Sequence, residues 1–512
     1  MRSLRSLAIA MALATAVGFT VPASRAAPAA PPGPGEILTP PPGPAPRING
    51  PKVYGCRPGH PFLYRVPCTG TRPVRFEAAG LPDGLALDAA SGIITGTTPE
   101  KKGSYAVTLS ATNGQGKASR PFTIVVGDTL ALTPPMGWND WYTWTDRITD
   151  ARMRSAADIL ISTGMADHGY NYVNIDDCWM VKPGSNDPQL GGPIRDPKGA
   201  ILPNKRFPDM KAMTAYIHAK GLKAGLYTGP GPTTCAGFTA SWQHEEIDAK
   251  TFADWGFDFL KHDWCSYTSV AGGNDRAHLM KPYQLMGGIL ARLDRDVVFN
   301  LCQYGMGNVW EWGGDVGGHC WRTTGDVGME KGDRLPGFYR VGMSNALHAQ
   351  YARPGRWNDP DYLLIGVVGA GHCGLNADEE YVYMSMWSLM AAPLFYSGDM
   401  EKLDAFTLSV LCNAEVIDVN QDTLGKQAWV VRQDASDLVL AKPLDDGSLA
   451  IGIFNLGEEP RDIAASWREL KLDGTRKVRD LWRQKDIGPV DGSYSARVNR
   501  HGVMMVRLAP GS

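Results

Sequence analysis

The chain has 512 residues, of which 43% are hydrophobic and 20% are charged, and its formal net charge is −2. This is the composition of an ordinary globular protein, and it gives no electrostatic reason to expect nucleic acid or an anionic membrane as a partner. A chain of this length exceeds what one core supports, so two or three domains are expected.

Residues 1–26 have the layout of a cleaved secretory signal peptide. Arg2 and Arg5 precede an apolar run at 7–21, and Ala-Ser-Arg-Ala ends at position 26. The run is too short for a comfortable transmembrane helix, although an uncleaved anchor is the alternative. We therefore expect a secreted or periplasmic protein. Residues 27–46, rich in Pro, Ala and Gly, are predicted to form an extended linker.

Residues 47–128 alternate between short strand-like runs and turns. Turn signals stand at 80–84 and 90–92, and the runs at 105–112 and 121–126 are typical of half-buried strands. This pattern predicts a β-sandwich, and its Leu-Pro-Asp-Gly-Leu and Gly-Ile-Ile-Thr-Gly-Thr-Thr-Pro elements resemble immunoglobulin-like repeats of secreted bacterial proteins. Its role, carbohydrate binding or a passive spacer, stays open.

Residues 130–422 alternate between apolar strands and amphipathic helices. The predicted strands end at Trp138, Asp176, Tyr227, Asp263, Gln303, Asp326, Asp359 and Ser397. Helices are predicted at 150–164, 209–219, 246–255, 281–293, 341–351 and 379–390. This alternation predicts a (β/α)₈ TIM barrel, in which chemistry lies where strands end. A doubly wound α/β fold is the alternative, but no Gly-rich nucleotide loop follows an early strand.

Residues 423–512 are predicted to form a C-terminal antiparallel β-domain docked against the barrel. Short strand-like runs at 428–432, 438–441, 449–454 and 503–508 are separated by polar turns. The predicted fold class is thus a multidomain chain with a catalytic barrel flanked by two β-domains.

The chain has nine cysteines, so in an exported protein at least one thiol is unpaired. No Cys-x-x-Cys or clustered His/Cys set is present, and we predict neither a metal site nor a cofactor. Cys56 and Cys68 are close enough in sequence to form a bridge.

Two carboxylates at strand ends are the minimum equipment for breaking a glycosidic bond. Asp263 ends the apolar run Phe257-Asp-Phe-Leu-Lys-His-Asp263, and Asp326 ends Cys320-Trp-Arg-Thr-Thr-Gly-Asp326. An ionised group is costly to hold at the end of a hydrophobic strand unless it is hydrogen-bonded or functional. Other strand-end candidates are Asp176, Asp177, Asp359 and Asp361. Residue types alone do not select the pair.

From Pro134 to the C-terminus the chain resembles glycoside hydrolase family 27, which contains α-galactosidases and α-N-acetylgalactosaminidases. The matching motifs occur in the family's order. They are Pro135-Met-Gly-Trp, Asn174-Ile-Asp-Asp-Cys-Trp, Cys235-Ala-Gly-Phe, Thr251-Phe-Ala-Asp-Trp-Gly, Lys261-His-Asp-x-Cys, Cys320-Trp-Arg, Gly355-Arg-Trp-Asn-Asp-Pro-Asp and Asn420-Gln-Asp-x-Leu-Gly-Lys-Gln.

The resemblance implies a retaining, double-displacement hydrolysis of α-D-galactosides. Asp263 takes the place of the nucleophile and Asp326 that of the acid/base. Asp176 and Asp177 take the place of the carboxylates that hold the 4- and 6-hydroxyls of galactose. Further implied pocket residues are Trp141, which packs against the sugar ring, and Tyr227, Lys261 and Arg322. Two implied disulfides are Cys235–Cys265 and Cys302–Cys320.

The chain departs from the family at its fifth strand, where Cys-Glu-Trp is usual. Here it reads Cys302-Gln303-Tyr304-Gly-Met306, so the expected partner of the 2-hydroxyl is Gln303. The bulk of Gln303 and Met306 disfavours an N-acetyl group at carbon two. Trp264 replaces a smaller residue beside the nucleophile and is expected to narrow the pocket or add a stacking surface. Cys178 lacks the family's usual partner and is expected to be free.

Three other activities of the family stay open as alternatives: isomalto-dextranase, α-N-acetylgalactosaminidase and β-L-arabinopyranosidase. A sugar-binding protein on a degenerate barrel is the alternative outside enzymes, but both catalytic aspartates are present. The expected partner is an oligosaccharide or polysaccharide, and the sequence does not indicate an oligomeric state.

Overall fold

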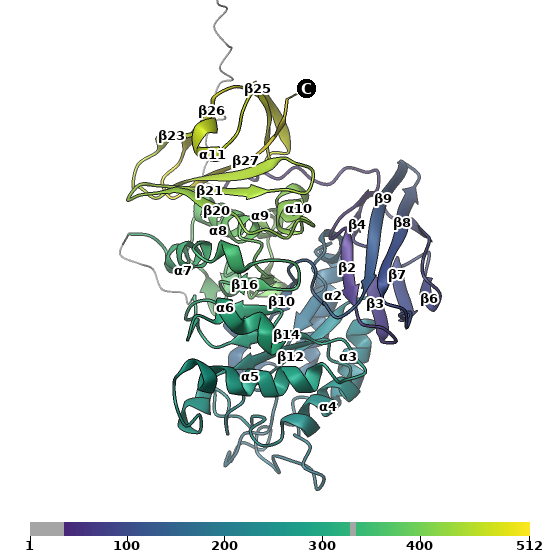
Figure 1. Cartoon of the computed structure of the whole chain (residues 1–512). Coiled ribbons are helices and arrows are strands. Elements are labelled where there is room, and N and C mark those ends of the chain that lie inside the picture. The colour runs from purple at the N-terminus through teal and green to yellow at the C-terminus, as the bar shows by residue number, and fades with distance from the viewer. Residues whose placement is uncertain (1–34, 328–333, 512) are drawn as a thin grey trace, which may run out of the picture.

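The computed structural model describes residues 35–327 and 334–511 (Figure 1). The predicted signal peptide and the first part of the predicted linker, 27–34, lie outside the described residues, so the signal stays a prediction. Within the described ranges, we find no helix with the length and apolar character needed to cross a membrane.

The N-terminal β-module, 47–126, consists of small antiparallel sheets and one parallel pair. A four-stranded sheet has the order β2 (Val53–Cys56), β9 (Gly116–Val126), β8 (Gly103–Asn113) and β5 (Arg75–Ala79). A three-stranded sheet joins β3 (Pro61–Arg65), β7 (Ile93–Thr97) and β6 (Leu85–Leu87), and β1 (Arg47–Ile48) pairs with β4 (Cys68–Thr69). Cys56 and Cys68 are buried free thiols, so the bridge considered above is not formed.

Eight parallel strands form the catalytic barrel, which confirms the predicted fold class. In chain order they are β10 (Met136–Asn139), β11 (Tyr172–Asn174), β12 (Lys223–Thr228), β13 (Phe259–Asp263), β14 (Val298–Cys302), β15 (Cys320–Arg322), β16 (Trp357–Asp359) and β19 (Leu394–Tyr396). From β10 to β16 each strand pairs with the next, and β19 pairs with β10, whereas β16 and β19 are not paired as strands. Leu363 closes the ring, because its N–H donates to Phe395 O at 2.8 Å and its carbonyl accepts from Ser397 N at 3.0 Å.

Helices and short turns connect these strands. The α-helices are α1 (Trp141–Trp144), α2 (Asp150–Ser162), α3 (Met210–His218), α4 (Glu245–Trp255), α5 (Arg276–Leu290), α6 (Val309–Trp312), α7 (Gly337–Ala346), α8 (Ala377–Leu389), α9 (Ala405–Leu411) and α10 (Ala414–Asn420). The 3₁₀ turns are η1 (Thr145–Arg147), η2 (Ala166–His168), η3 (Cys265–Ser269), η4 (Gly313–Val316), η5 (Ala349–Tyr351) and η6 (Met400–Lys402), and a hairpin joins β17 (Val367–Val368) to β18 (Gly371–His372).

One predicted strand end is wrong in a way that matters for the site. The sixth strand, β15, ends at Arg322, and Asp326 lies four residues further on, in the following loop. Arg322 pairs with Asp359, the last residue of β16, so the ladder between the two strands ends there.

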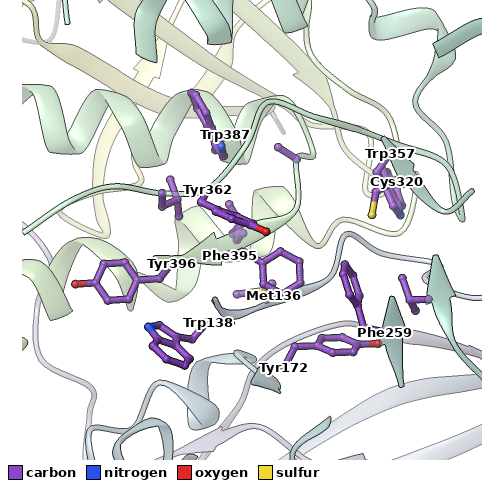
Figure 2. Packing of buried hydrophobic residues seen from close by; sticks show 14 of the residues in the cluster. Met136, Trp138, Tyr172, Phe259, Cys320, Trp357, Tyr362, Trp387, Phe395 and Tyr396 are labelled. Carbon is purple, nitrogen blue, oxygen red and sulfur yellow. The ribbon is translucent and has the colours of Figure 1, made fainter. Parts of the chain in front are cut away.

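Aromatic side chains fill the barrel interior (Figure 2). The ring of Phe259 packs edge-on against Tyr172 and Phe395, with centroids 5.6 Å and 5.3 Å away. Met136 and Trp138 lie in the same buried cluster, and both are at most 2% exposed. The barrel is therefore a packed core rather than a pore, and its polar groups are displaced to the ends of the strands.

The C-terminal domain is antiparallel, as predicted. Its six-stranded sheet has the order β20 (Trp429–Gln433), β21 (Asp437–Pro443), β22 (Leu449–Asn455), β27 (Val503–Pro510), β24 (Arg476–Asp480) and β25 (Lys485–Val490). The pair β23 (Arg461–Ser466) and β26 (Ser493–Val498) with α11 (Trp467–Leu470) encloses a second core. The opposite face packs on α8, where a methyl of Leu389 reaches Gly452 (Figure 1).

The N-terminal β-module is docked to the barrel, at the amino ends of its strands. Arg57 reaches Asp296, just before β14, with Nε 2.8 Å from Oδ1 and the backbone N–H 3.0 Å from Oδ2. The same guanidinium donates to the carbonyls of Leu290 and Ala291, which end α5. His60 Nδ1 lies 2.8 Å from Asp296 Oδ1. Arg57 thus acts as a C-cap of a barrel helix.

Replacing Arg57 by Ala is expected to destabilise the protein by about 2 kcal/mol, because it leaves two helix-end carbonyls and part of a largely buried carboxylate without donors. The midpoint of urea unfolding, followed by circular dichroism, measures the effect. Arg497→Ala is the control, since its pair with Asp462 is 3.5 Å long and exposed, and it should cost under about 0.5 kcal/mol. Equal effects of the two substitutions would contradict a docked module.

Candidate active site

The proposed nucleophile, Asp263, is the last residue of β13 and is 5% exposed. Its two carboxylate oxygens each accept a phenol hydrogen bond. Tyr227 Oη donates to Oδ2 at 3.1 Å, and Tyr304 Oη donates to Oδ1 at 2.7 Å. Burial raises the pKa of Asp263, whereas the Lys261 ammonium and the two phenols oppose this rise. Hydrogen bonds to a carboxylate favour its ionised form.

Asp176, two residues beyond β11, accepts three hydrogen bonds on one oxygen. The donors to Oδ2 are Lys261 Nζ at 2.8 Å, Asn139 Nδ2 at 3.0 Å and Tyr362 Oη at 3.0 Å. Lys261 also lies 5.2 Å and 5.0 Å from the ring centres of Tyr227 and Tyr362. Although burial alone lowers the pKa of Lys261, the anions around it, Asp176 foremost, raise the pKa well above its usual value.

Asp140, after β10, and Asp176 and Asp177, after β11, form a group of carboxylates that we call the acidic wall. Asp177 accepts from the backbone N–H groups of Cys178 at 2.6 Å and Ala236 at 2.9 Å. Burial raises the pKa of Asp177 to about 6. Asp140 Oδ1 accepts from Asp176 N at 2.6 Å, and burial, followed by the Asp176 charge, raises the pKa of Asp140 well above its usual value. Asp140 therefore positions the backbone that carries Asp176.

Arg322 links Asp326 to the barrel. Its Nη2 lies 3.0 Å from Asp361 Oδ2 and 3.1 Å from Asp326 Oδ1. Asp361 is buried and also accepts from Tyr142 Oη at 3.1 Å and Val327 N at 2.9 Å. The Asp326 side chain, by contrast, is 59% exposed. The buried carboxylate of Asp361 thus fixes Arg322, and Arg322 in turn holds the exposed carboxylate of Asp326.

Gln303 is 1% exposed, and neither its Nε2 nor its Oε1 has a hydrogen-bond partner among the described residues. A buried amide left without partners is costly, and none of the described side chains offsets this cost. Trp141 is the first residue of α1. Its backbone N–H donates to Asn139 Oδ1 at 2.9 Å, and the residue is half-buried.

Trp264 does not take either of the two roles expected for it. Its indole Nε1 donates to Thr268 Oγ1 at 2.7 Å, and its ring packs against Tyr267 and Tyr283 with centroids 5.0 Å and 6.4 Å away. The residue after the strand-end aspartate points to the opposite face of the strand. Trp264 is therefore part of the core under α5.

Of the two implied disulfides, Cys235–Cys265 is formed and Cys302–Cys320 is not. The parallel register pairs Asn300, not Cys302, with Cys320. Two residues of offset on neighbouring strands place the Cα atoms of Cys302 and Cys320 about 8 Å apart, beyond the ~7 Å limit for a bridge. Instead, Asn300 Nδ2 donates to Cys320 Sγ at 3.1 Å, and Arg322 Nη1 lies 3.8 Å from Cys302 Sγ. Cys178 is free, as expected.

Among the residues of the site that the sequence prediction missed are Tyr304, Tyr362 and Asn139. Each adjoins a recognised motif residue, namely Gln303, Asp361 or Trp138. Tyr304 had a visible signal, because it stands where the family motif has tryptophan. The contacts of Tyr362 and Asn139 with Asp176 join segments 186 and 37 residues apart, and residue types alone do not indicate them.

One cluster of potential metal ligands lies on the loop after β16, apart from the carboxylates above. Cys373 Sγ and His372 Nε2 each lie 3.6 Å from Glu380 Oε1. Glu380 Oε1 accepts from Gly366 N, and His372 Nδ1 accepts from Gly374 N, both at 3.0 Å. We assign no metal to this cluster.

A (β/α)₈ barrel that gathers carboxylates, two buried cations and an aromatic ring at its strand ends has the arrangement of a glycoside hydrolase. A model of the family described as Alpha galactosidase A matches residues 133–422. A model of the alpha galactosidase C-terminal beta sandwich domain matches residues 437–508, and an Ig-domain model matches residues 46–127. The chain therefore belongs to the α-galactosidase family of glycoside hydrolases, family 27, as its motifs predict.

Several known proteins are similar over most of the chain. Alpha-galactosidase 2 of Arabidopsis thaliana is 36% identical over 79% of this chain and 96% of its own length. Alpha-galactosidase A of Cellvibrio japonicus is 34% identical over 74% of this chain and 93% of its own length. α-Galactosidase I of Mortierella vinacea superposes with a TM-score of 0.67 at 29% identity, over 75% of this chain and 98% of that one. A Bacteroides fragilis structure, inferred to be an α-galactosidase/melibiase, superposes with a TM-score of 0.84 at 35% identity, over 91% and 98%.

A thiol count tests the correction to the disulfides. Nine cysteines with one disulfide leave seven thiols, and titration of the unreduced, denatured protein with a thiol reagent should find seven. Cys320→Ser serves as the internal control. It should lower the count by one, whereas a Cys302–Cys320 bridge would give a lower starting count that rises by one on the same substitution.

Proposed function

We propose that this enzyme is an exported, retaining α-galactosidase that releases terminal α-D-galactosyl residues from oligosaccharides. The observation that carries the mechanism is the contrast between Asp263, buried and held by two phenols, and Asp326, exposed on the loop after β15. The substrate rests on relatives named α-galactosidases, one of which, from Saccharomyces cerevisiae, was solved with raffinose.

In the first step, an Asp263 oxygen attacks the anomeric carbon and displaces the aglycone oxygen. Asp326 donates its proton to that oxygen as the glycosidic bond breaks. The product is a covalent β-galactosyl ester of Asp263. Lys261 and the two phenols favour this role, because they keep a buried carboxylate ionised and fixed in orientation.

In the second step, Asp326 removes a proton from a water molecule, and the water oxygen attacks the same carbon. The ester C–O bond breaks, and its electron pair returns to Asp263. Two inversions give net retention. The exposed position of Asp326 suits this step, because water reaches it directly.

Galactose recognition is assigned to the acidic wall and to Gln303. Asp176 and Asp177 accept from the 4- and 6-hydroxyls, since a carboxylate makes stronger hydrogen bonds to hydroxyl groups than a neutral acceptor does. Gln303 bonds the 2-hydroxyl, which gives its unpartnered amide a partner. Trp141 packs against the sugar ring, and Arg322 and Tyr227 line the region around the anomeric centre.

Export is proposed from the arginines and apolar run at 1–26 together with the Cys235–Cys265 disulfide. Disulfides persist in oxidising compartments such as the periplasm and the medium. The bridge joins the loop before α4 to the residue two beyond Asp263, so an oxidising environment directly supports the site.

Substitutions of Asp263 and Asp326 are expected to impair turnover in different ways. Asp263→Ala should lower kcat by about 10⁴-fold on every substrate, because the covalent step is lost. Asp326→Ala should slow the hydrolysis of alkyl galactosides by about 10²–10⁴-fold. It should slow the hydrolysis of aryl galactosides far less, because a good leaving group departs without being protonated. Steady-state kinetics on both substrate kinds measure this difference.

Azide provides the stereochemical control for these variants. Because azide needs no general base, it should restore turnover of Asp326→Ala and give the α-galactosyl azide. With Asp263→Ala, azide can attack only the substrate itself, so any product should be the β-azide. Reversed products, or an Asp326→Ala variant as active as wild type on alkyl galactosides, would exclude these assignments.

A panel of aryl glycosides tests the sugar. We expect the α-galactoside to be preferred over the α-N-acetylgalactosaminide, α-glucoside and β-L-arabinopyranoside, with little release from dextran. Gln303 and Met306 leave little room for an N-acetyl group at carbon two. Activity on dextran or the arabinopyranoside without activity on the α-galactoside would keep the mechanism and replace the substrate.

A further inference from the structure

The loop that follows β14 has an unusual backbone. Tyr304, Gly305, Gly307 and Asn308 all have positive φ values, of 65°, 82°, 62° and 56°. A tyrosine in this region is a genuine outlier, because its Cβ is crowded by the backbone. A Cβ at Gly305 would lie 2.3 Å from Thr323 O, so only glycine permits this close approach to the loop after β15. Glycines at 305 and 307 thus permit a tightly wound backbone at this loop.

This conformation directs the Tyr304 phenol at the proposed nucleophile. Its Oη donates to Asp263 Oδ1 at 2.7 Å, the shorter of the two phenol bonds to that carboxylate. The ring lies 6.0 Å from the Arg322 guanidinium, and Cys235 Sγ is 3.6 Å from the hydroxyl. Tyr304 thus contacts the loop after β12 through its hydroxyl and lies near the end of β15 through its ring.

We propose that Tyr304 is a positioning residue of this enzyme, whose phenol orients the Asp263 carboxylate and keeps it ionised. The proposal rests on the proposed role of Asp263 as nucleophile. It does not follow from the typical family motif Cys-Glu-Trp, which has tryptophan where this chain has Tyr304 and whose indole has no hydroxyl.

The surroundings of Asp263 show why one more donor matters. The charged or titratable groups that face it are Lys261 on its own strand, Tyr227 on β12, Asp176 after β11, Cys302 on β14, Tyr283 on α5 and Tyr304. Lys261 is the cation of this set, and it is shared with Asp176. Burial and Asp176 both raise the pKa of Asp263, so ionisation depends on Lys261 and on the two phenols.

The phenol is suited to act as a permanent donor. Burial, with the neighbouring Cys302 and Asp263, raises the pKa of Tyr304 far above its usual value, so its hydroxyl keeps its proton over the working range. The same bond assists the second displacement. When the ester C–O bond breaks, the electron pair returns to Asp263, and a phenol already in place stabilises the charge that develops there.

Tyr304→Phe removes the hydroxyl and keeps the ring. The acid limb of the kcat/KM profile reports the pKa of the group that must be ionised in the free enzyme. Loss of a bond that favours the ionised form raises that pKa, so the acid limb should move to higher pH by about one unit. At the pH optimum kcat should fall about ten-fold or more.

Tyr216→Phe is the matched control. Tyr216 also donates its phenol to a carboxylate, at 2.9 Å from both oxygens of Asp158, but this pair lies on the outer helices α3 and α2. Its pH profile should superimpose on that of the wild type. Tyr304→Trp provides the second variant, since it restores the family's aromatic residue without a hydroxyl and should show the same shift as Tyr304→Phe.

The experiment begins with the wild type and 5-fluoro-α-galactosyl fluoride, a probe that traps the covalent intermediate for peptide mass spectrometry. Label on Asp263, followed by an upward shift of the acid limb in either Tyr304 variant but not in Tyr216→Phe, supports the inference. Label on Asp263 with an unmoved acid limb overturns the inference alone. Label on another residue overturns the proposed nucleophile and the inference together.

Discussion

Charge balance at the carboxyl ends of the strands constrains the whole site, and Lys261 is central to it. An unpaired carboxylate in a dry interior costs several kcal/mol, so the buried Asp176 and Asp263 need a cation between them. Side chains two apart on a strand share a face, which places the ammonium of Lys261 beside the carboxylate of Asp263. The same ammonium lies 2.8 Å from Asp176 Oδ2. The Lys-x-Asp spacing is therefore a requirement of strand geometry and electrostatics together.

Backbone strain accompanies the strand ends that carry the carboxylates. Non-glycine residues with positive φ follow or adjoin the strand ends at Cys178, Cys265, Tyr304 and Asp361, all at the face that carries the carboxylates. Such conformations persist only where the surrounding structure over-determines them. Two features supply that support. One is the aromatic core inside the barrel, formed by Tyr172, Phe259 and Phe395, and the other is the docking of Arg57 at the amino ends of the strands. The N-terminal β-module thereby supports the barrel at the end opposite to the carboxylates.

The barrel was predictable because strand and helix periods alternate along the chain, and because each strand ends in a polar residue. Three features were not predictable. The end of β15 at Arg322 depends on where pairing with β16 stops, and the separation of Cys302 from Cys320 depends on the parallel register. The contact of Tyr304 with Asp263 depends on four left-handed residues whose combined path no local propensity specifies. The alternation of strand and helix periods in the sequence locates the strand ends, whereas strand register and loop conformation determine which side chains come into contact there.

The two aspartates proposed for catalysis differ in the way their tasks require. A nucleophile must present one oxygen in a fixed direction and stay ionised, and Asp263 lies at the end of a rigid strand with a donor on each oxygen. An acid/base must exchange its proton with a departing sugar and an incoming water. Asp326 lies four residues beyond its strand, exposed to water and connected to the barrel through Arg322 and Asp361. Residues 323–325, which follow the end of β15, thus separate the exposed environment of Asp326 from the buried environment of Asp263. A sixth strand that ended at position 326 would have buried both carboxylates alike.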